Sequence, residues 1–475
     1  MLKIKNIILA TATAAMLSSC GNDFLELDPY QQIGDDIAIE KVDDIATAVT
    51  GVYYWMGSSS FLGRNLTALG DIASDNVRHT NATSHLRALY LYTYQPTTSE
   101  ISNLWQVGYK IIDHSSRIIE KATPLLANAT KADSAVIYKG LSQAYAMRGY
   151  ATFALTNVFA LPYSEANLQT QGVVLVEHPV QPFEKVSRAT LGETYEYVID
   201  QFEKAASAAQ GASSITNEQF YMNSKAITAM QARVSLYKGD YEKAKAYAKQ
   251  VIGNPETESR IATTVTAYNE MFDKLSGSAE DIFVIAKSND DHLSANSLNT
   301  LYYNYGVGIS DDLTALYADT DIRKQKLTPY ASSRNFSGGK YAEDITNVPV
   351  IRLPEMYLIV AECEAMAGNA DASAAALYEV AKRNTAITSP ADLPNTIDEL
   401  KAFIVDERRR ELFQEGHRLY DTRRLNETIY VAAGSKILEN GIALYPIPAD
   451  EINSGSGVEQ TADWVTYRPK AVNPN

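Results

Sequence analysis

Apolar residues recur at helical spacing along most of the chain. In ISNLWQVGYKIIDHSSRIIEKA (101–122) they fall at nearly every third or fourth position, which is the pattern of a helix with one buried face. A second helix is predicted over 133–162, where Asp133 or Ser134 can act as the N-cap and Pro162 ends the segment. The periodicity therefore predicts a mainly helical protein.

Two segments have the form of a helical hairpin. NSKAITAMQARVSLYKGDYEKAKAYAKQVI (223–252) carries alanines at helical spacing on both sides of Gly239, and RLPEMYLIVAECEAMAGNADASAAALYEVAKRN (352–384) does the same around Gly368. Small residues at this spacing let two antiparallel helices approach closely, as in tetratricopeptide repeats. Such arrays need about three repeats to bury a continuous core. We interpret 133–162 as a third, degenerate pair that lacks the Gly-Asp turn.

Between the helical segments lie long stretches rich in Ser, Thr, Asn, Gly and Tyr. The longest are 57–100, 163–187 and 287–348. They are too long to be ordinary connections, and loops of this length usually carry function or move. We therefore expect these stretches to be functional or mobile.

The charge balance limits the possible partners. The 475 residues include 42 basic and 57 acidic ones, for a formal net charge of −15, which argues against nucleic acid or an anionic lipid surface as the main partner. The run DERRRELFQEGHRLYDTRR (406–424) holds six arginines and five acids. This mixture predicts ion pairs between helical neighbours, such as Glu407 with Arg410, that tie helices together.

The N-terminus carries targeting information. Residues 1–19 place Lys3 and Lys5 before the apolar segment IILATATAAML and two serines, which is the layout of a signal peptide. The ending LSSC resembles the bacterial lipoprotein box, so Cys20 is the predicted lipid attachment. The alternative is a chance cysteine after an ordinary signal peptide. Cys363, in an apolar context, is predicted to be buried, and no disulfide is expected.

Sequence motifs give no sign of an enzyme. The six histidines are scattered, and the chain has no HExxH motif, no paired Cys/His spacing and no GxSxG motif. We therefore predict no catalytic residue, no metal site and no cofactor. A binding protein remains the better interpretation.

Three stretches near the C-terminus, in a fixed order, resemble a known family. They are RLPEMYLIVAECEAMAGN, DERRRELFQEGHRLYDTRR and LYPIPADEI (444–452), and the lipoprotein box and the helix RGYATFALTNVFALPY add to them. Together they resemble the SusD/RagB-like outer-membrane nutrient-binding lipoproteins. The resemblance implies one all-α domain over 20–475, with a scaffold of tetratricopeptide-like helix pairs. Long irregular loops and a few short strands would form its ligand face.

The resemblance also implies a function. The protein would be anchored through Cys20 on the outer face of the outer membrane. It would capture an oligosaccharide there and deliver it to a SusC-like TonB-dependent transporter. A peptide ligand, as in RagB-like members, is an alternative, and a protein-binding scaffold or adhesion lipoprotein is a third possibility from another class.

Two Tyr-rich segments are the candidate ligand face. By the resemblance, this face lies in 74–95, before the helix of Trp105, and in 288–308. Aromatic and polar side chains interleave there, as expected of an adaptable recognition surface. For LYLYTY, a β-strand packed on the scaffold is an equal alternative. The predicted ligand-binding residues are Asn76, Arg78, His79, Tyr90, Tyr92, Tyr302, Tyr303 and Tyr305.

Overall fold

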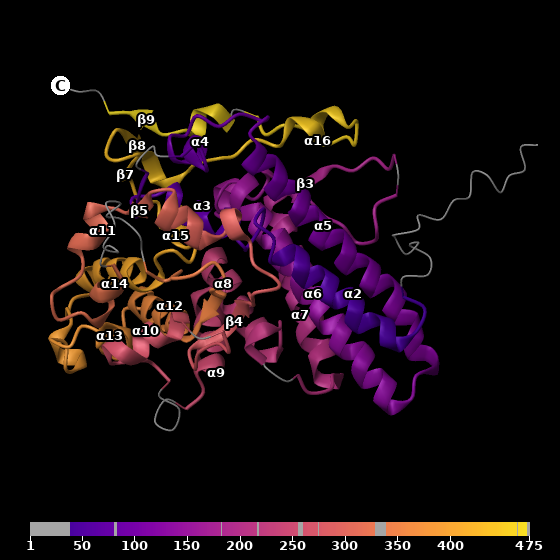
Figure 1. The fold of residues 1–475 in the computed structure, drawn as a ribbon, viewed down its shortest axis with the longest axis horizontal. Helices are drawn as coiled ribbons and strands as arrows, with labels where there is room; N and C mark the ends of the chain where they lie inside the picture. Colours follow the sequence, from indigo (N-terminus) through magenta and orange to yellow (C-terminus); the bar gives the residue numbers. More distant parts are fainter. Residues whose placement is uncertain are drawn as a thin grey trace, which may run out of the picture.

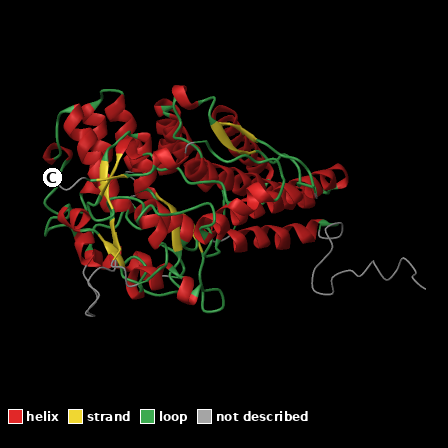
Figure 2. Cartoon of the chain, turned by 90° about the horizontal axis from the view of Figure 1, so that it is seen from above, coloured by secondary structure: helices red, strands yellow, loops and turns green. Residues whose placement is uncertain are grey.

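Helices make up most of the structure, and short strands join distant loops (Figures 1 and 2). The signal peptide and Cys20 lie outside the described residues. One hydrophobic core reaches from Ile39 to Trp464. The computed structural model describes residues 39–79, 83–181, 183–215, 218–254, 260–273, 275–327, 339–462 and 464–472.

Four long helices pack side by side in the first half of the chain (Figure 1). The apolar face of α5 is buried as its periodicity predicts, and it includes Trp105. Gly140 of α6 lets α2 approach closely, because a Cβ at this position would lie 2.2 Å from Ile45. These helices are α2 (Val42–Met56), α5 (Ser99–Ala122), α6 (Lys131–Phe159) and α7 (Leu191–Gly211).

The predicted helix over 133–162 is confirmed as α6, and the interpretation of this segment as a helix pair is wrong, because α6 is unbroken. None of its residues has a positive φ, and Gly140 and Gly149 both keep helical geometry. The N-cap is also earlier than expected. Thr130 accepts a hydrogen bond from the backbone N–H of Asp133 at 3.2 Å. α6 instead pairs with its neighbours α5 and α7.

The other two predicted pairs are confirmed. α8 (Ser224–Lys238) and α9 (Tyr241–Ile252) are joined at Gly239, with φ of 79°. α12 (Leu353–Met366) and α13 (Ala370–Ala381) are joined at Gly368, with φ of 80°. Glycine adopts this left-handed conformation without the cost of a Cβ clash. α9 packs against α12, so the two pairs form one layer, which α14 (Ile397–Leu412) extends.

Short antiparallel strands join segments that lie far apart in the sequence. β1 pairs with β5, β2 with β3 and β4 with β6, while β7, β8 and β9 form one small sheet. The strands are β1 (Val77–His79), β2 (Gln171–Val174), β3 (Arg188–Thr190), β4 (Asp281–Ile285), β5 (Val307–Ile309), β6 (Val348–Arg352), β7 (Ile429–Val431), β8 (Lys436–Leu438) and β9 (Lys470–Ala471).

Shorter helical elements fill the connections. The α-helices are α3 (Asn65–Ile72), α4 (Arg87–Tyr90), α10 (Val265–Asp273), α11 (Asp311–Ala315), α15 (Arg418–Arg424) and α16 (Ala449–Asn453). The 3-10 helices are η3 (Thr123–Asn128), η4 (Glu165–Asn167), η5 (Glu218–Phe220), η6 (Ser294–Asn296), η8 (Ile322–Leu327), η9 (Pro390–Asp392), η10 (Glu439–Gly441) and η11 (Trp464–Tyr467). One further turn, η7 (Thr300–Asn304), is a π-helix.

The charge run 406–424 does tie helices together, as predicted. Arg410 donates to Glu407 at 2.7 Å, and Arg408 of α14 donates to Asp421 of α15 at 2.8 Å. The run also belongs to a larger cluster, which we call the buried charge network. Its members are Arg323, Lys340, Arg352 and Arg383 with Glu280, Asp321, Glu407, Glu411 and Glu415.

Candidate functional site

The β1–β5 pair brings together the two segments that the sequence predicts as a ligand face. Val77 pairs with Ile309 and His79 with Val307. The Ser310 backbone N–H donates to the carbonyl of Asn76 at 2.9 Å, which continues the ladder. Residues more than 200 positions apart in the sequence thus form one surface.

Five of the eight predicted residues are buried: Asn76, His79, Tyr90, Tyr92 and Tyr302. Asn76 donates to Asp71 Oδ1 at 3.1 Å and accepts from Arg409 Nε at 3.0 Å. The His79 ring lies 3.1 Å from the carbonyl of His85 and packs against Tyr90. These buried side chains therefore support the surface formed by β1 and β5 and do not face the solvent.

The two remaining buried tyrosines are fixed in the same way. Tyr92 donates its hydroxyl to the carbonyl of Ala73 at 2.6 Å, and Tyr302 stacks on Tyr341 with ring centroids 6.0 Å apart. The LYLYTY segment is neither an open loop nor a strand, because it forms the short helix α4 and a turn with φ of 53° at Tyr92. Because Tyr92 and Tyr302 are buried, neither ring has a face open to a ligand.

Arg78, Tyr303 and Tyr305 reach the surface. Arg78 is the exposed residue between the buried Val77 and His79 of β1. Its Nη1 lies 3.4 Å from Asp311 Oδ2. Tyr305 stacks on His85, with ring centroids 4.6 Å apart and planes 8° apart. Burial and the charge of Arg64 lower the pKa of His85, so this stack holds a neutral imidazole at neutral pH.

An open hollow of about 440 Å³ lies beside Arg78. It lies where β1 and the turn from β5 to α11 meet the β7–β8 hairpin, at the upper left of Figure 1. Tyr430 of β7, with 58% of its surface exposed, supplies the aromatic side chain. We call this site the β1–β7 hollow; its lining includes Ser74, Asp75, Arg78, Asp311, Asp312 and Tyr430.

Buried arginines compensate the charge at the base of the hollow. Arg418 binds both carboxylate oxygens of Asp75, at 2.7 and 2.9 Å, and Arg409 Nη2 lies 3.4 Å from one of them. Burial alone would raise the pKa of Asp75, but the hydrogen bond and charge of Arg418 lower it below its usual value. Asp75 is therefore ionised and fixed. Asp311 and Asp312, by contrast, are exposed at the rim.

Family models match most of this chain. The model of the SusD family matches residues 180–464. A second model, described as starch-binding and associating with the outer membrane, matches residues 23–236. The chain belongs to the SusD family.

Similar proteins and solved structures agree with the assignment of this chain to the SusD family. It is 23% identical to SusD-like protein P2 of Formosa agariphila, over 87% of this chain and 90% of the relative. A putative sugar binding protein from Bacteroides vulgatus matches with a TM-score of 0.80 and 25% identity, over 90% of this chain and 99% of its own. A SusD superfamily protein from Bacteroides thetaiotaomicron has a TM-score of 0.78 and 23% identity, over 89% and 99%. The predicted fold is confirmed.

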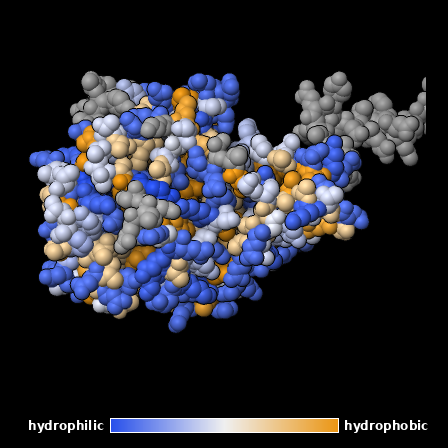
Figure 3. All heavy atoms as spheres, turned by 90° about the horizontal axis from the view of Figure 1, so that it is seen from below, coloured by the Kyte–Doolittle hydropathy of each residue, from blue (hydrophilic) through white to orange (hydrophobic). Residues whose placement is uncertain are grey.

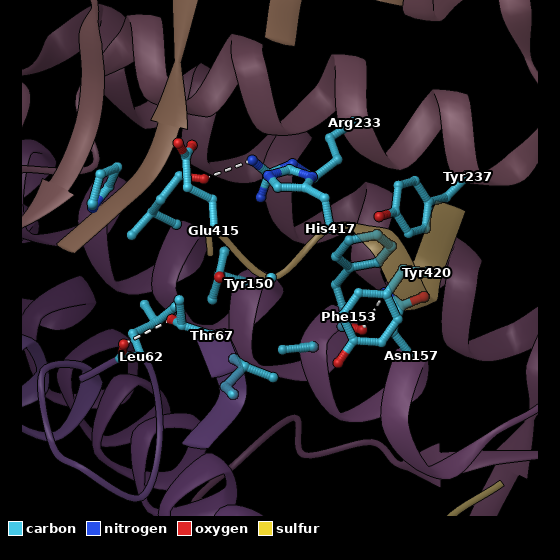
Figure 4. Close-up of a pocket in the computed structure, with 15 residues that line it drawn as sticks. Leu62, Thr67, Tyr150, Phe153, Asn157, Arg233, Tyr237, Glu415, His417 and Tyr420 are labelled. Carbon is cyan, nitrogen blue, oxygen red and sulfur yellow. Dashed lines mark hydrogen bonds between the residues drawn. The ribbon is translucent and has the colours of Figure 1, made fainter. Parts of the chain in front are cut away.

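A second cavity, of about 50 Å³, lies inside this SusD-family protein (Figure 4). Arg233 lines one side of it and donates to Glu355 at 2.7 and 2.6 Å. His417 and Tyr420 face the cavity, and burial lowers the pKa of His417 to about 4. Its size suits a few water molecules rather than a sugar ring. The β1–β7 hollow is therefore the better candidate for a ligand site.

The structure also bears on metal binding, membrane insertion and the polarity of the surface. Within the described part of the chain, no cluster of three or more His, Cys, Asp and Glu is arranged to hold a metal ion. No helix among those residues has the length and apolar character needed to cross a membrane. The face in Figure 3 is mostly hydrophilic, with hydrophobic side chains in small separate groups.

Sequence reasoning missed Tyr430 in this SusD-family protein. Ile429 and Val431 are buried on either side of it, so the three residues show the alternation of a half-buried strand. That alternation in TIYVAAGSKI was the available signal. It covers only three strand residues, and it does not tell which surface the tyrosine joins.

Proposed function

We propose that this SusD-family protein captures an oligosaccharide in the β1–β7 hollow. One observation carries the proposal: the exposed ring of Tyr430 lines the same hollow as Arg78 and the carboxylates of Asp311 and Asp312. An aromatic ring can cover the apolar face of a sugar, and charged side chains can hydrogen-bond its hydroxyls. Tyr303 and Tyr305, half-buried beyond β1, can extend this surface.

The hollow is open rather than enclosed, which suits a chain that continues in both directions. Its framework is held by the β1–β5 ladder and by the bonds of Arg418 and Arg409 to Asp75. A site that is formed before binding loses little conformational freedom when the ligand arrives. The five buried residues among our candidates contribute through this framework.

We further propose that the protein acts at the outer face of the outer membrane. A lipid on Cys20 would anchor it, and a SusC-like TonB-dependent transporter would receive the ligand. The family description that mentions the outer membrane supports this location. Mass spectrometry of the membrane-bound protein tests the anchor: an unmodified Cys20, or an N-terminus that retains Met1, would contradict it. Copurification of a TonB-dependent barrel from solubilised membranes tests the partner.

The ligand site is tested by affinity electrophoresis of the purified protein in native gels that contain neutral polysaccharides. We expect at least one polysaccharide to retard the protein. Tyr430→Ala should weaken that binding about tenfold, because an aromatic contact of about 1.5 kcal/mol is lost. Tyr54→Ala is the matched control, since Tyr54 is 64% exposed on α2 and does not line the hollow.

Two results would contradict the proposal. Retardation that is equal in Tyr430→Ala and the wild type would move the site elsewhere. Binding of a peptide mixture without binding of any polysaccharide would favour the peptide-binding alternative. We propose no catalytic step, so the polysaccharide should be recovered at unchanged length after incubation with the protein, as judged by size-exclusion chromatography.

A further inference from the structure

The charged groups around the β1–β7 hollow are unevenly exposed. Two of its cations are withdrawn from the surface: Arg418 is buried, Arg409 is partly buried, and both bind Asp75. Arg418 also binds Glu427 at 2.7 Å. Its anions are at the rim, because Asp311 and Asp312 are both exposed. A ligand that enters the hollow therefore meets the carboxylates of Asp311 and Asp312 before it meets the guanidinium of Arg409 or Arg418.

Arg78 is the exposed cation of the lining, and it faces a carboxylate. Its Nη1 lies 3.4 Å from Asp311 Oδ2, with side-chain exposures of 46% and 83%. The charge of Asp311 offsets that of Arg78, and Asp312 then leaves the rim with a net negative charge. Asp75, together with Arg409, Arg418 and Glu427, adds no net charge to this balance.

We infer that the β1–β7 hollow takes an uncharged glycan and rejects glycans that carry carboxylate or sulfate groups. This inference rests on the proposed function, because it concerns the ligand class of the same site. Hydroxyl groups can donate hydrogen bonds to Asp311 and Asp312, whereas an anionic substituent would be repelled by them. The net charge of −15 acts in the same direction at longer range.

The expected size of the discrimination follows from Coulomb's law. The repulsion between two like charges about 5 Å apart in water-like surroundings weakens binding by roughly fourfold. The one uncompensated carboxylate at the rim should therefore weaken binding of an anionic glycan by about fourfold. Because the groups are exposed, added salt should reduce this difference.

The test compares two derivatives of one polysaccharide. The neutral polysaccharide that retards the protein is converted into a hydroxyethyl and a carboxymethyl derivative of equal substitution. The added groups have similar bulk, and only the second is charged. Affinity electrophoresis of the full-length protein at low salt should show about fourfold weaker binding of the carboxymethyl derivative. High salt should bring the two derivatives within about twofold of each other.

The double variant Asp311→Asn, Asp312→Asn removes both rim charges and keeps the side-chain shapes. It should remove the preference for the hydroxyethyl derivative, because the rim then carries no negative charge to repel the carboxymethyl groups. The double variant Asp43→Asn, Asp371→Asn removes two exposed charges on α2 and α13, outside the lining, and is the matched control. It should retain the difference between the derivatives.

The outcomes separate this inference from the proposed function. If no polysaccharide binds, the proposed function fails and the inference fails with it. If an anionic polysaccharide binds and Tyr430→Ala weakens that binding, the site stands and the inference is overturned. Equal binding of the two derivatives at low salt overturns it as well.

Discussion

The buried charge network and the β1–β7 hollow use the same types of charged side chain for opposite purposes. In the network, Arg352 contacts Glu280, Glu411 and Glu415, and each of these side chains is almost fully buried. In the hollow, Arg78 meets Asp311 with both side chains largely exposed. The network joins β6, α14 and η8 within the scaffold, whereas the hollow presents its charges to solvent.

The difference lies in the solvent rather than in the chemistry of the pairs. A buried charge has lost its hydration and depends on its partners, so removal of one partner leaves an uncompensated ion in the interior. An exposed pair exchanges its partner for water at little cost. An exposed pair can therefore be opened by a ligand, and a buried pair can fix the geometry that the ligand meets.

The largest effect is expected for Arg352→Met. Methionine has a similar length but no charge, so the variant leaves three buried glutamates without their shared cation. The free energy of unfolding should fall by about 3–5 kcal/mol, as measured by urea denaturation followed by circular dichroism. Arg352→Lys keeps the charge and should recover part of the loss.

The matched control is Arg78→Met, the same substitution in the exposed pair. It should change the free energy of unfolding by less than about 0.5 kcal/mol. If the two variants lost equal stability, burial would not be the property that separates the two regions.

An intermediate effect is expected from pH. The pKa of Glu411 is lowered to about 2, because the charges of Arg383, Arg352, Arg323 and Lys340 outweigh the opposing effect of burial. The folded state therefore binds this proton more weakly than the unfolded state does. The stabilisation is present above the ordinary pKa of 4.5 and is lost as pH falls toward 2.

Glu411→Gln isolates this contribution. The stability difference between the wild type and the variant should shrink by about 1.4 kcal/mol between about pH 6 and about pH 3.5. Thermal and urea unfolding at both pH values measure the difference, so other titrating groups cancel. A difference that does not change with pH would show that Glu411 is not held ionised by its neighbours.

Local signals predict much of the scaffold. The apolar stripe of α5 and the glycine turns at Gly239 and Gly368 are properties of short segments, and the structure agrees with them. The error at 133–162 has a physical cause. The prediction required a turn where no residue favours one, and α6 continued as a helix against α5 and α7.

The ligand face was harder to predict, because it depends on contacts between distant segments. The pairing of β1 with β5 turns His79 inward and Arg78 outward, and residues more than 200 positions away decide that choice. Tyr302 is buried because it meets Tyr341. Composition indicated that these segments carry function, but it could not tell which tyrosines support the surface and which ones form it.

The smallest effect is expected for the coupling between Arg78 and Asp311. A double-mutant cycle with Arg78→Ala and Asp311→Ala should give a coupling of less than about 0.5 kcal/mol in the free energy of unfolding, because water replaces each partner. The same cycle at Arg233 and Glu355, where a bidentate pair is buried, should give a clearly larger value. A strong coupling at the exposed pair would mean that it holds the hollow in shape, and the ligand would then have to break a structural contact to enter.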